Sequence, residues 1–192
     1  MACLEHEKLA DAGAIEALLD RAFGEGREQK TAQRLRDGNR PAIALVARDE
    51  AGAVIGTLRL WPVAIGERRG MLLLGPLAVD EARRCERIGA RLMRRALAEA
   101  SFAGWGAVIL VGDAPYYERF GFHTAPTAGM QLPGPVDRAR FLALELKPGA
   151  LAGASGMVQA DLPMPADAKV VALRKRRAPR RRTGLAAHRA AS

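Results

Sequence analysis

The feature that most restricts the fold of this chain is an apolar run with an internal Gly-Pro pair, followed by a short loop and an amphipathic helix. The run is L-L-L-G-P-L-A-V, Leu72 to Val79, and R-C-E-R-I-G-A-R-L-M follows it from Arg84 to Met93. The first turn of a helix offers free backbone N–H groups and a positive dipole end, which bind anions such as phosphate. The sequence therefore predicts a strand, an anion-binding loop and a helix, in this order.

A second segment of the same kind follows later in the chain. The run V-I-L-V, Val108 to Val111, precedes A-P-Y-Y-E-R-F-G-F, Ala114 to Phe122. Together the two segments resemble the two signature halves of the GNAT superfamily of N-acetyltransferases. The segments L-L-L-G-P-L-A-V, L-V-G-D-A-P-Y-Y and A-L-E-L-K-P-G-A-L are similar to a bacterial branch of that family called YhbS-like. The resemblance covers roughly residues 11–151.

The resemblance implies an α/β fold of GNAT type, with a mixed, mostly antiparallel sheet, helices on both faces and splayed central strands. It also implies an enzyme that uses acetyl-coenzyme A as co-substrate. Hydrophobic periodicity and turn residues predict the remaining elements. These are a helix from the N-cap Asp11 to about Gly24, a short helix across Glu28 to Arg36, strands at Ile43 to Ala47 and Val54 to Trp61 joined by the turn D-E-A-G, and a helix from about Ile88 to Phe102.

Gly75 and Pro76 are anomalous inside a strand, because proline cannot donate to a ladder of hydrogen bonds. One interpretation is a bulge that lets this strand diverge from the strand at Val108 to Val111. The other is that the pair ends a short strand early. In the first case, the resemblance implies that the pantetheine arm of the coenzyme contacts Leu77, Ala78 and Val79.

The loop before the second long helix carries the predicted phosphate site. The resemblance assigns it to Arg84, Cys85, Glu86, Arg87, Ile88, Gly89 and Ala90. In the family pattern Q/R-x-x-G-x-G/A, Arg84 matches the first position and Gly89 the last, but Arg87 stands where the first glycine belongs. The arginine side chain either crowds the pyrophosphate or pairs with it. Cys85 is either a reactive thiol at a helix start or a small filler.

Tyr117 stands where the family has its general acid, four residues before Gly121. The resemblance also implies that Asp113 faces the pantetheine, while a backbone N–H around Val79 could stabilise the developing oxyanion. We interpret Tyr116 as a packing residue. No carboxylate lies on the strand that ends at Val79, so the sequence gives no general base; Glu67, Asp80 and Glu118 are the nearest acidic residues.

The net charge of +9 is concentrated at the C-terminal end. Residues 174–192 contain eight of the 30 basic residues and no acidic one, which leaves residues 1–173 nearly neutral. Blocks of like charge repel and stay unfolded. We therefore expect an acetyltransferase domain at residues 1–173 and a disordered basic tail at 174–192. The tail is either simply solvated or makes weak contacts with nucleic acid or acidic surfaces.

Other cofactors and compartments are constrained by what the sequence lacks. Two cysteines and three histidines without ligand spacing predict neither a metal site nor a disulfide. With no membrane-length apolar run and no leader pattern at Met1, we expect a cytoplasmic protein without a membrane contact. A homodimer is left open.

The function predicted from these features is transfer of the acetyl group of acetyl-coenzyme A to an amine of a small molecule, with a protein or tRNA amine as a less favoured acceptor. Two alternatives remain: a non-catalytic acyl-coenzyme A binding module with a regulatory role, suggested by Arg87 and the missing base, and an RNA- or ribosome-associated protein that acts through its tail. The sequence does not specify the acceptor.

Deletion of residues 174–192 should leave folding and acetyl transfer intact and abolish retention on heparin or RNA, because these residues carry eight positive charges and little apolar material. Circular dichroism and salt-dependent elution measure the two effects. Loss of coenzyme binding on truncation would contradict this division of the chain.

Overall fold

The computed structural model describes residues 2–24 and 31–162. The predicted tail and the boundary at residue 173 lie outside the described residues, as do residues 28–30 of the predicted second helix. Among the described residues, no helix is long and apolar enough to span a membrane.

Within the described residues, eight strands form a mixed sheet with the order β1-β2-β3-β4-β5-β7, to which β8 adds by pairing with β3 and β6. The strands are β1 (Cys3–His6), β2 (Ile43–Arg48), β3 (Val54–Ile65), β4 (Arg68–Val79), β5 (Ala107–Val111), β6 (Met130–Gln131), β7 (Phe141–Glu145) and β8 (Gly156–Ala160). The pairs β4–β5 and β6–β8 are parallel and the other pairs are antiparallel. The predicted mixed, mostly antiparallel sheet is confirmed.

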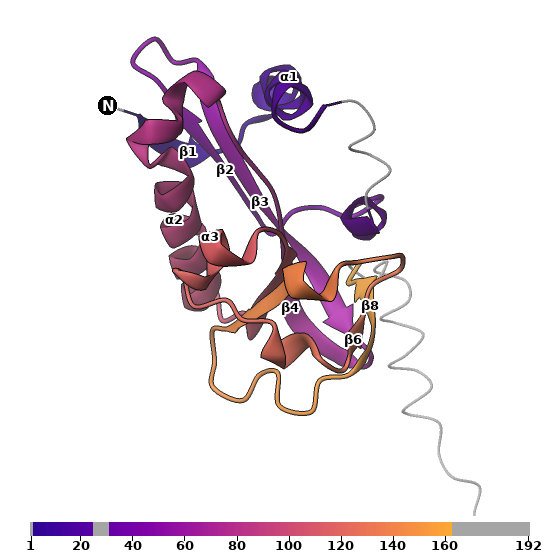
Figure 1. Ribbon diagram of the computed structural model, residues 1–192. Helices are drawn as coiled ribbons and strands as arrows, with labels where there is room; N and C mark the ends of the chain where they lie inside the picture. The colour runs from indigo at the N-terminus through magenta and orange to yellow at the C-terminus, as the bar shows by residue number, and fades with distance from the viewer. Residues whose placement is uncertain (1, 25–30, 163–192) are drawn as a thin grey trace, which may run out of the picture. The chain divides into compact units, whose positions relative to one another are not determined.

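Helices cover both faces of this sheet (Figure 1). They are α1 (Ala12–Phe23), α2 (Ile88–Phe102) and the short α3 (Ala114–Glu118), with 3₁₀ turns η1 (Leu9–Asp11), η3 (Thr31–Leu35), η4 (Glu81–Glu86), η5 (Ala125–Thr127) and η6 (Arg138–Arg140). Ile88, Leu92, Ala96 and Ala100 of α2 are fully buried against one face, as predicted. On the opposite face, α1 packs Ile15, Leu18 and Leu19 against Val46 and Ala78.

The bounds of α2 were predicted correctly, whereas several other elements differ from the prediction. The second helix is a 3₁₀ turn, Thr31–Leu35, in its described part. β3 continues to Ile65 and β4 begins at Arg68, so this hairpin is longer than the apolar runs alone indicated. β1, β6, β7, β8 and α3 were not predicted from the sequence.

Asp11 occupies the N-cap position of α1, but its side chain does not cap the helix. Its two carboxylate oxygens accept hydrogen bonds from Arg48 Nη2, both at 2.7 Å, and the Lys8 N–H donates to one of them at 2.8 Å. Arg48 holds the pKa of the Asp11 carboxyl below its usual range, because it bonds the charged form. The carboxylate therefore links the start of α1 to β2 of the sheet instead of capping the helix.

The Gly75–Pro76 pair forms a bulge inside β4, as the first interpretation predicted. Leu58 pairs with Leu77 and Leu60 with Leu74, so the single residue Arg59 opposes both Gly75 and Pro76. Beyond the bulge, β4 leaves β5: the parallel pairing covers only Met71 to Leu73 against Ala107 to Ile109. The predicted splay of the central strands is confirmed, and it opens the sheet between the two segments singled out in the sequence.

Candidate active site

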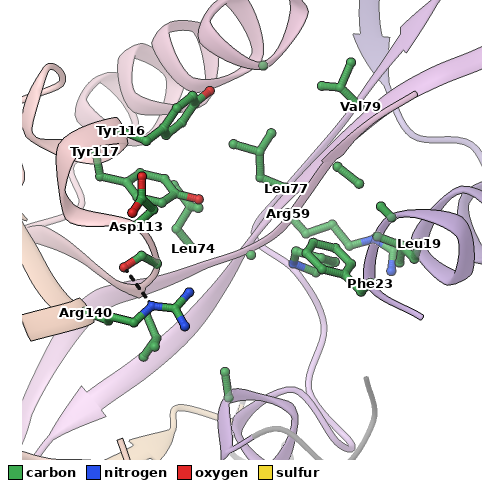
Figure 2. Close-up of a pocket in the computed structure, with 18 of the residues that line it drawn as sticks. Leu19, Phe23, Arg59, Leu74, Leu77, Val79, Asp113, Tyr116, Tyr117 and Arg140 are labelled. Carbon is green, nitrogen blue, oxygen red and sulfur yellow. Dashed lines mark hydrogen bonds between the residues drawn. The ribbon is translucent and has the colours of Figure 1, made fainter. Parts of the chain in front are cut away.

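A large cavity of about 1580 Å³ lies where β4 and β5 part. Its wall includes the end of β4, the first turn of α2, the turn from β5 into α3, the inner face of α1 and the 3₁₀ turn η3. Figure 2 shows 18 of the residues that line it. We call the part beside the start of α2 the α2 half, and the part beside α1 and η3 the α1 half; Tyr117 lies between them.

The strand edge along the α2 half has no strand partner beyond Leu73 within the described part of the chain. Asp80 donates its N–H to the carbonyl of Ile55 on β3, at 2.9 Å. Because backbone groups of a strand point alternately to its two edges, Val79 and Leu77 direct their N–H and C=O groups away from β3, toward the open side. A ligand in this gap can therefore hydrogen-bond to β4 as a further strand would.

Arg87 is the N-cap residue immediately before α2, and its backbone is left-handed, with φ 56° and ψ 22°. Glycine adopts this conformation without strain, whereas other residues pay about 1–2 kcal/mol. The backbone at this position therefore has a conformation that favours glycine, although an arginine stands there. The Arg87 side chain is exposed and lines the α2 half.

Gly89, in the first turn of α2, faces the hydroxyl of Tyr116. A Cβ atom at Gly89 would lie 2.9 Å from that hydroxyl oxygen and 3.5 Å from a methyl group of Val79. The missing side chain thus lets the Tyr116 hydroxyl approach the helix start closely. Tyr116, which the sequence analysis treated as a packing residue, has its polar end at the cavity wall as well as its ring against Tyr117 and Phe120.

Tyr117 is half-buried, with its hydroxyl directed into the cavity (Figure 2). Its ring is held between Tyr116 at 4.9 Å and the buried Phe122 at 6.1 Å, both in edge-to-face contacts measured between ring centroids. Gly112 leaves space for the ring, since a Cβ there would lie only 2.2 Å from Cε2 of Tyr117. Burial raises the pKa of Tyr117 to about 12, and Tyr116 and Asp113 add to the rise. The phenol is therefore protonated at neutral pH.

Arginine dominates the charge of the cavity. The described lining holds three carboxylates, Glu16, Asp113 and Asp137, and seven arginines: Arg36, Arg59, Arg84, Arg87, Arg94, Arg119 and Arg140. Arg119 stacks over the Tyr116 ring at 4.0 Å, and Arg94 lies 5.9 Å from the Phe120 ring centroid. The cavity as a whole is suited to an anionic ligand.

Most residues predicted for the site lie in this lining. They are Leu77, Ala78, Val79, Arg84, Arg87, Gly89, Ala90, Asp113 and Tyr117. Cys85 and Glu86 are exposed outside the lining, Glu86 paired with Arg83, and Ile88 is fully buried in the core below α2. Cys85 is a free thiol. The roles of these residues remain predictions.

Two other arginines of α2 do not line the cavity and bind groups of the protein itself. Arg91 donates to the carbonyl of Ala2 at 2.8 Å, and Arg95 donates to the carbonyl of Leu4 at 2.6 Å and pairs with Glu99 at 2.9 Å. These contacts fix the N-terminal segment to α2. None of the acidic residues Glu67, Asp80 and Glu118 lies in the described lining.

Three residues of the lining were not predicted from the sequence: Arg140, Trp61 and Arg36. Arg140 precedes β7, and its guanidinium points into the α1 half, with Nε donating to the Gly112 carbonyl at 3.4 Å (Figure 2). Trp61 donates its indole N–H to the Gly75 carbonyl at 2.6 Å. A Cβ on Gly75 would lie 2.8 Å from Nη2 of Arg36. Each of these contacts joins segments that are separated in the chain, so no local sequence pattern indicated them.

The fold, with its two parting central strands, is that of an acyltransferase. The model of the GNAT acetyltransferase domain matches residues 40–124. The uncharacterized N-acetyltransferase YhbS of Escherichia coli K12 is 35% identical over 150 residues, which are 78% of this chain and 90% of that protein. The chain therefore belongs to the GNAT family of N-acetyltransferases.

Solved structures of relatives agree with this assignment. Escherichia coli YhbS in complex with CoA has a TM-score of 0.73 at 34% identity, covering 83% of this chain and 89% of that one. A GNAT family acetyltransferase from Brucella melitensis in complex with acetyl-CoA has a TM-score of 0.61 at 30% identity, covering 86% and 97%. The predicted family, branch and fold are confirmed.

Gly112→Ala should lower the free energy of unfolding by about 1–3 kcal/mol, because the new methyl group would overlap the Tyr117 ring and force the ring or β5 to move. Denaturant unfolding measures the change. The matched control is Gly13→Ala in α1, where a Cβ meets nothing within 4 Å; it should be neutral or stabilising by up to about 1 kcal/mol. Equal effects of the two variants would contradict the proposed contact.

Proposed function

We propose that this chain transfers the acetyl group of acetyl-coenzyme A to the amine of a small molecule in the cytoplasm. The single observation that carries the proposal is the gap between β4 and β5, which opens beside the first turn of α2. One wall offers unpaired backbone groups and the next offers a helix N-terminus. An elongated ligand with an amide-bearing arm and a phosphate end requires both.

The residues of the α2 half fit such a donor. Leu77 and Val79 turn their backbone groups to the open edge, where the amides of a pantetheine arm can pair with them. The first turn of α2, with Gly89, would receive pyrophosphate, and Arg84 and Arg87 lie beside it. Arg84 also pairs with Glu81 at 3.0 Å, an exposed pair that a phosphate can displace at little cost.

Tyr117 is the proposed general acid. In the reaction, the amine nitrogen forms a bond to the acetyl carbon, the carbon–sulfur bond breaks, the sulfur takes up a proton and the amine loses one. The Tyr117 hydroxyl can supply the proton to sulfur, because it points into the middle of the cavity and stays protonated. A backbone N–H of β4 around Val79 would stabilise the negative charge that develops on the acetyl oxygen.

The proton of the amine has no dedicated acceptor in this proposal. The carboxylates of the described lining, Glu16, Asp113 and Asp137, come from three different elements. Glu16 lies 3.9 Å from Arg59, and Asp137 accepts the Ala139 N–H at 3.0 Å. The amine either binds in its neutral form or loses its proton through water. The proposed role of Tyr117 as general acid is the same for both routes of amine deprotonation.

The non-catalytic alternative rests on Arg87 and the absent base. The left-handed backbone at Arg87 weakens the argument from this arginine, because glycine would adopt the same backbone conformation there. Nothing in the described residues bears on RNA binding by the tail, so this function stays a prediction. A homodimer stays a prediction as well.

Titration of acetyl-coenzyme A into the protein and into Arg87→Gly, followed by calorimetry, tests the proposal. The wild-type protein should bind, and the glycine variant should bind about 5- to 100-fold more weakly, because it loses a charge-assisted contact while its backbone is relaxed. Arg87→Ala, which keeps the strained backbone, should lose as much affinity. No binding by the wild-type protein would refute the function, and tighter binding by the glycine variant would refute the role given to Arg87.

Tyr117→Phe should lower kcat roughly 10-fold or more and leave the affinity for acetyl-coenzyme A nearly unchanged, because the ring and its packing remain. Since the raised pKa of Tyr117, about 12, keeps its proton throughout the alkaline range, the wild-type rate should show no descending limb up to about pH 10. Steady-state kinetics across pH check both points. Tyr116→Phe is the control, and a larger loss in that variant would reverse the assignment.

A further inference from the structure

The α1 half of the cavity contains an arginine that the proposed reaction does not use. Arg140 points its guanidinium into this half, on the acceptor side of Tyr117 (Figure 2). Its Nε is the atom that donates to the Gly112 carbonyl, at 3.4 Å. Within residues 2–24 and 31–162, its two terminal nitrogens have neither a hydrogen-bond partner nor a carboxylate partner. An exposed arginine held by its Nε in the wall of a cavity offers two parallel donors to a ligand.

The other charges of the α1 half do not neutralise Arg140. Arg59 is already paired: its Nε and Nη2 donate to the Glu7 carboxylate, both at 2.8 Å, and Glu16 lies 3.9 Å from its Nη1. Asp137, three residues before Arg140, directs one carboxylate oxygen to the N–H of Ala139. Arg36 brings a second guanidinium to the strand bulge, against Gly75.

The apolar residues of this half set the size of the ligand. Phe23, Trp61 and Val136 lie in the lining together with the two arginines. A small apolar or polar body can fill the space between them, while a charged group on it reaches an arginine.

We propose that the acceptor amine carries an anionic group, a carboxylate or a phosphate, which Arg140 binds in the α1 half with Arg36 on the side of the bulge. This inference rests on the proposed function and adds the substrate class to it. The anion fixes one end of the acceptor, so that its amine is presented at Tyr117.

Arg140 also acts on the amine itself. A positively charged wall disfavours an ammonium group next to it and lowers its pKa. A larger share of the bound acceptor is therefore neutral and able to attack, which compensates for the lack of a dedicated base. A purely cationic amine without an anionic group would be repelled from the same wall.

Matched pairs of amines test this inference. Each pair differs only in the anionic group: phenylalanine against phenethylamine, glutamate against 4-aminobutyrate as the singly charged partner, and glucosamine 6-phosphate against glucosamine. The measured quantities are kcat/KM with acetyl-coenzyme A and, independently of turnover, equilibrium binding of each amine in the presence of CoA by saturation-transfer NMR. The more anionic member should be favoured at least about 10-fold in one or more pairs.

Arg140→Ala should remove that preference, lowering kcat/KM and binding of the anionic member roughly 10- to 100-fold and of its partner less than about 3-fold. Arg140→Lys should restore part of it, because the charge returns without the two parallel donors. Arg40→Ala is the matched control: Arg40 is exposed and outside the described lining, so its loss changes the net charge by the same amount. Affinity for acetyl-coenzyme A should be unchanged in all three variants.

The outcomes separate this inference from the function on which it rests. Equal binding of both members of every pair, or equal losses in Arg140→Ala and Arg40→Ala, would overturn it even if acetyl transfer is observed. A preference for the anionic members that Arg140→Ala abolishes, without any acetyl transfer, would support the anion site and count against the proposed reaction.

Discussion

The structure depends above all on the bulge at Gly75 and Pro76. It sets two residues of β4 against the single residue Arg59 of β3, and the Trp61 indole donates to the Gly75 carbonyl that the bulge removes from the ladder. A buried carbonyl without a donor would cost about 1–3 kcal/mol. The extra residue also shifts the alternation of the strand, so that Leu72 and Leu74 before it and Leu77 and Val79 after it all face α2. One local irregularity thereby preserves the core and opens the sheet.

The position of Tyr117 follows from that opening. Because β5 loses β4 as a neighbour after Ile109, the chain can turn at Gly112 into α3 and lay the tyrosine ring against its own backbone. Phe122 fixes the ring from the core and Tyr116 from the wall. The same burial that holds the ring raises the pKa of its hydroxyl, so the packing of Tyr117 also keeps its phenol protonated.

Local sequence was sufficient for α1, α2 and the strands β2 to β5, and for many of the residues that line the cavity, but not for β1, β6, β7, β8 or α3. The Gly-Pro pair inside an apolar run indicated the bulge, and the spacing of Ile88, Leu92, Ala96 and Ala100 gave the bounds of α2. It was insufficient where a side chain finds its partner across the fold. Asp11 was predicted as a cap, yet Arg48 on β2 takes its carboxylate; Arg140 lies in the cavity only because β7 pairs with β5. Such contacts are set by strand order, which no local pattern records.

The arginines at and near α2 show that residues of one type can have different roles in the same segment. On α2, Arg91 and Arg95 reach back to the carbonyls of Ala2 and Leu4, whereas Arg87 and Arg94, on the same helix, line the cavity. What separates them is the edge strand β1, which lies on the far side of β2 from the cavity and offers unpaired carbonyls only to the arginines near it. Arg91 and Arg95, which bind structural carbonyls, do not line the cavity, whereas Arg87, Arg94 and Arg140 do and contribute positive charge to its wall.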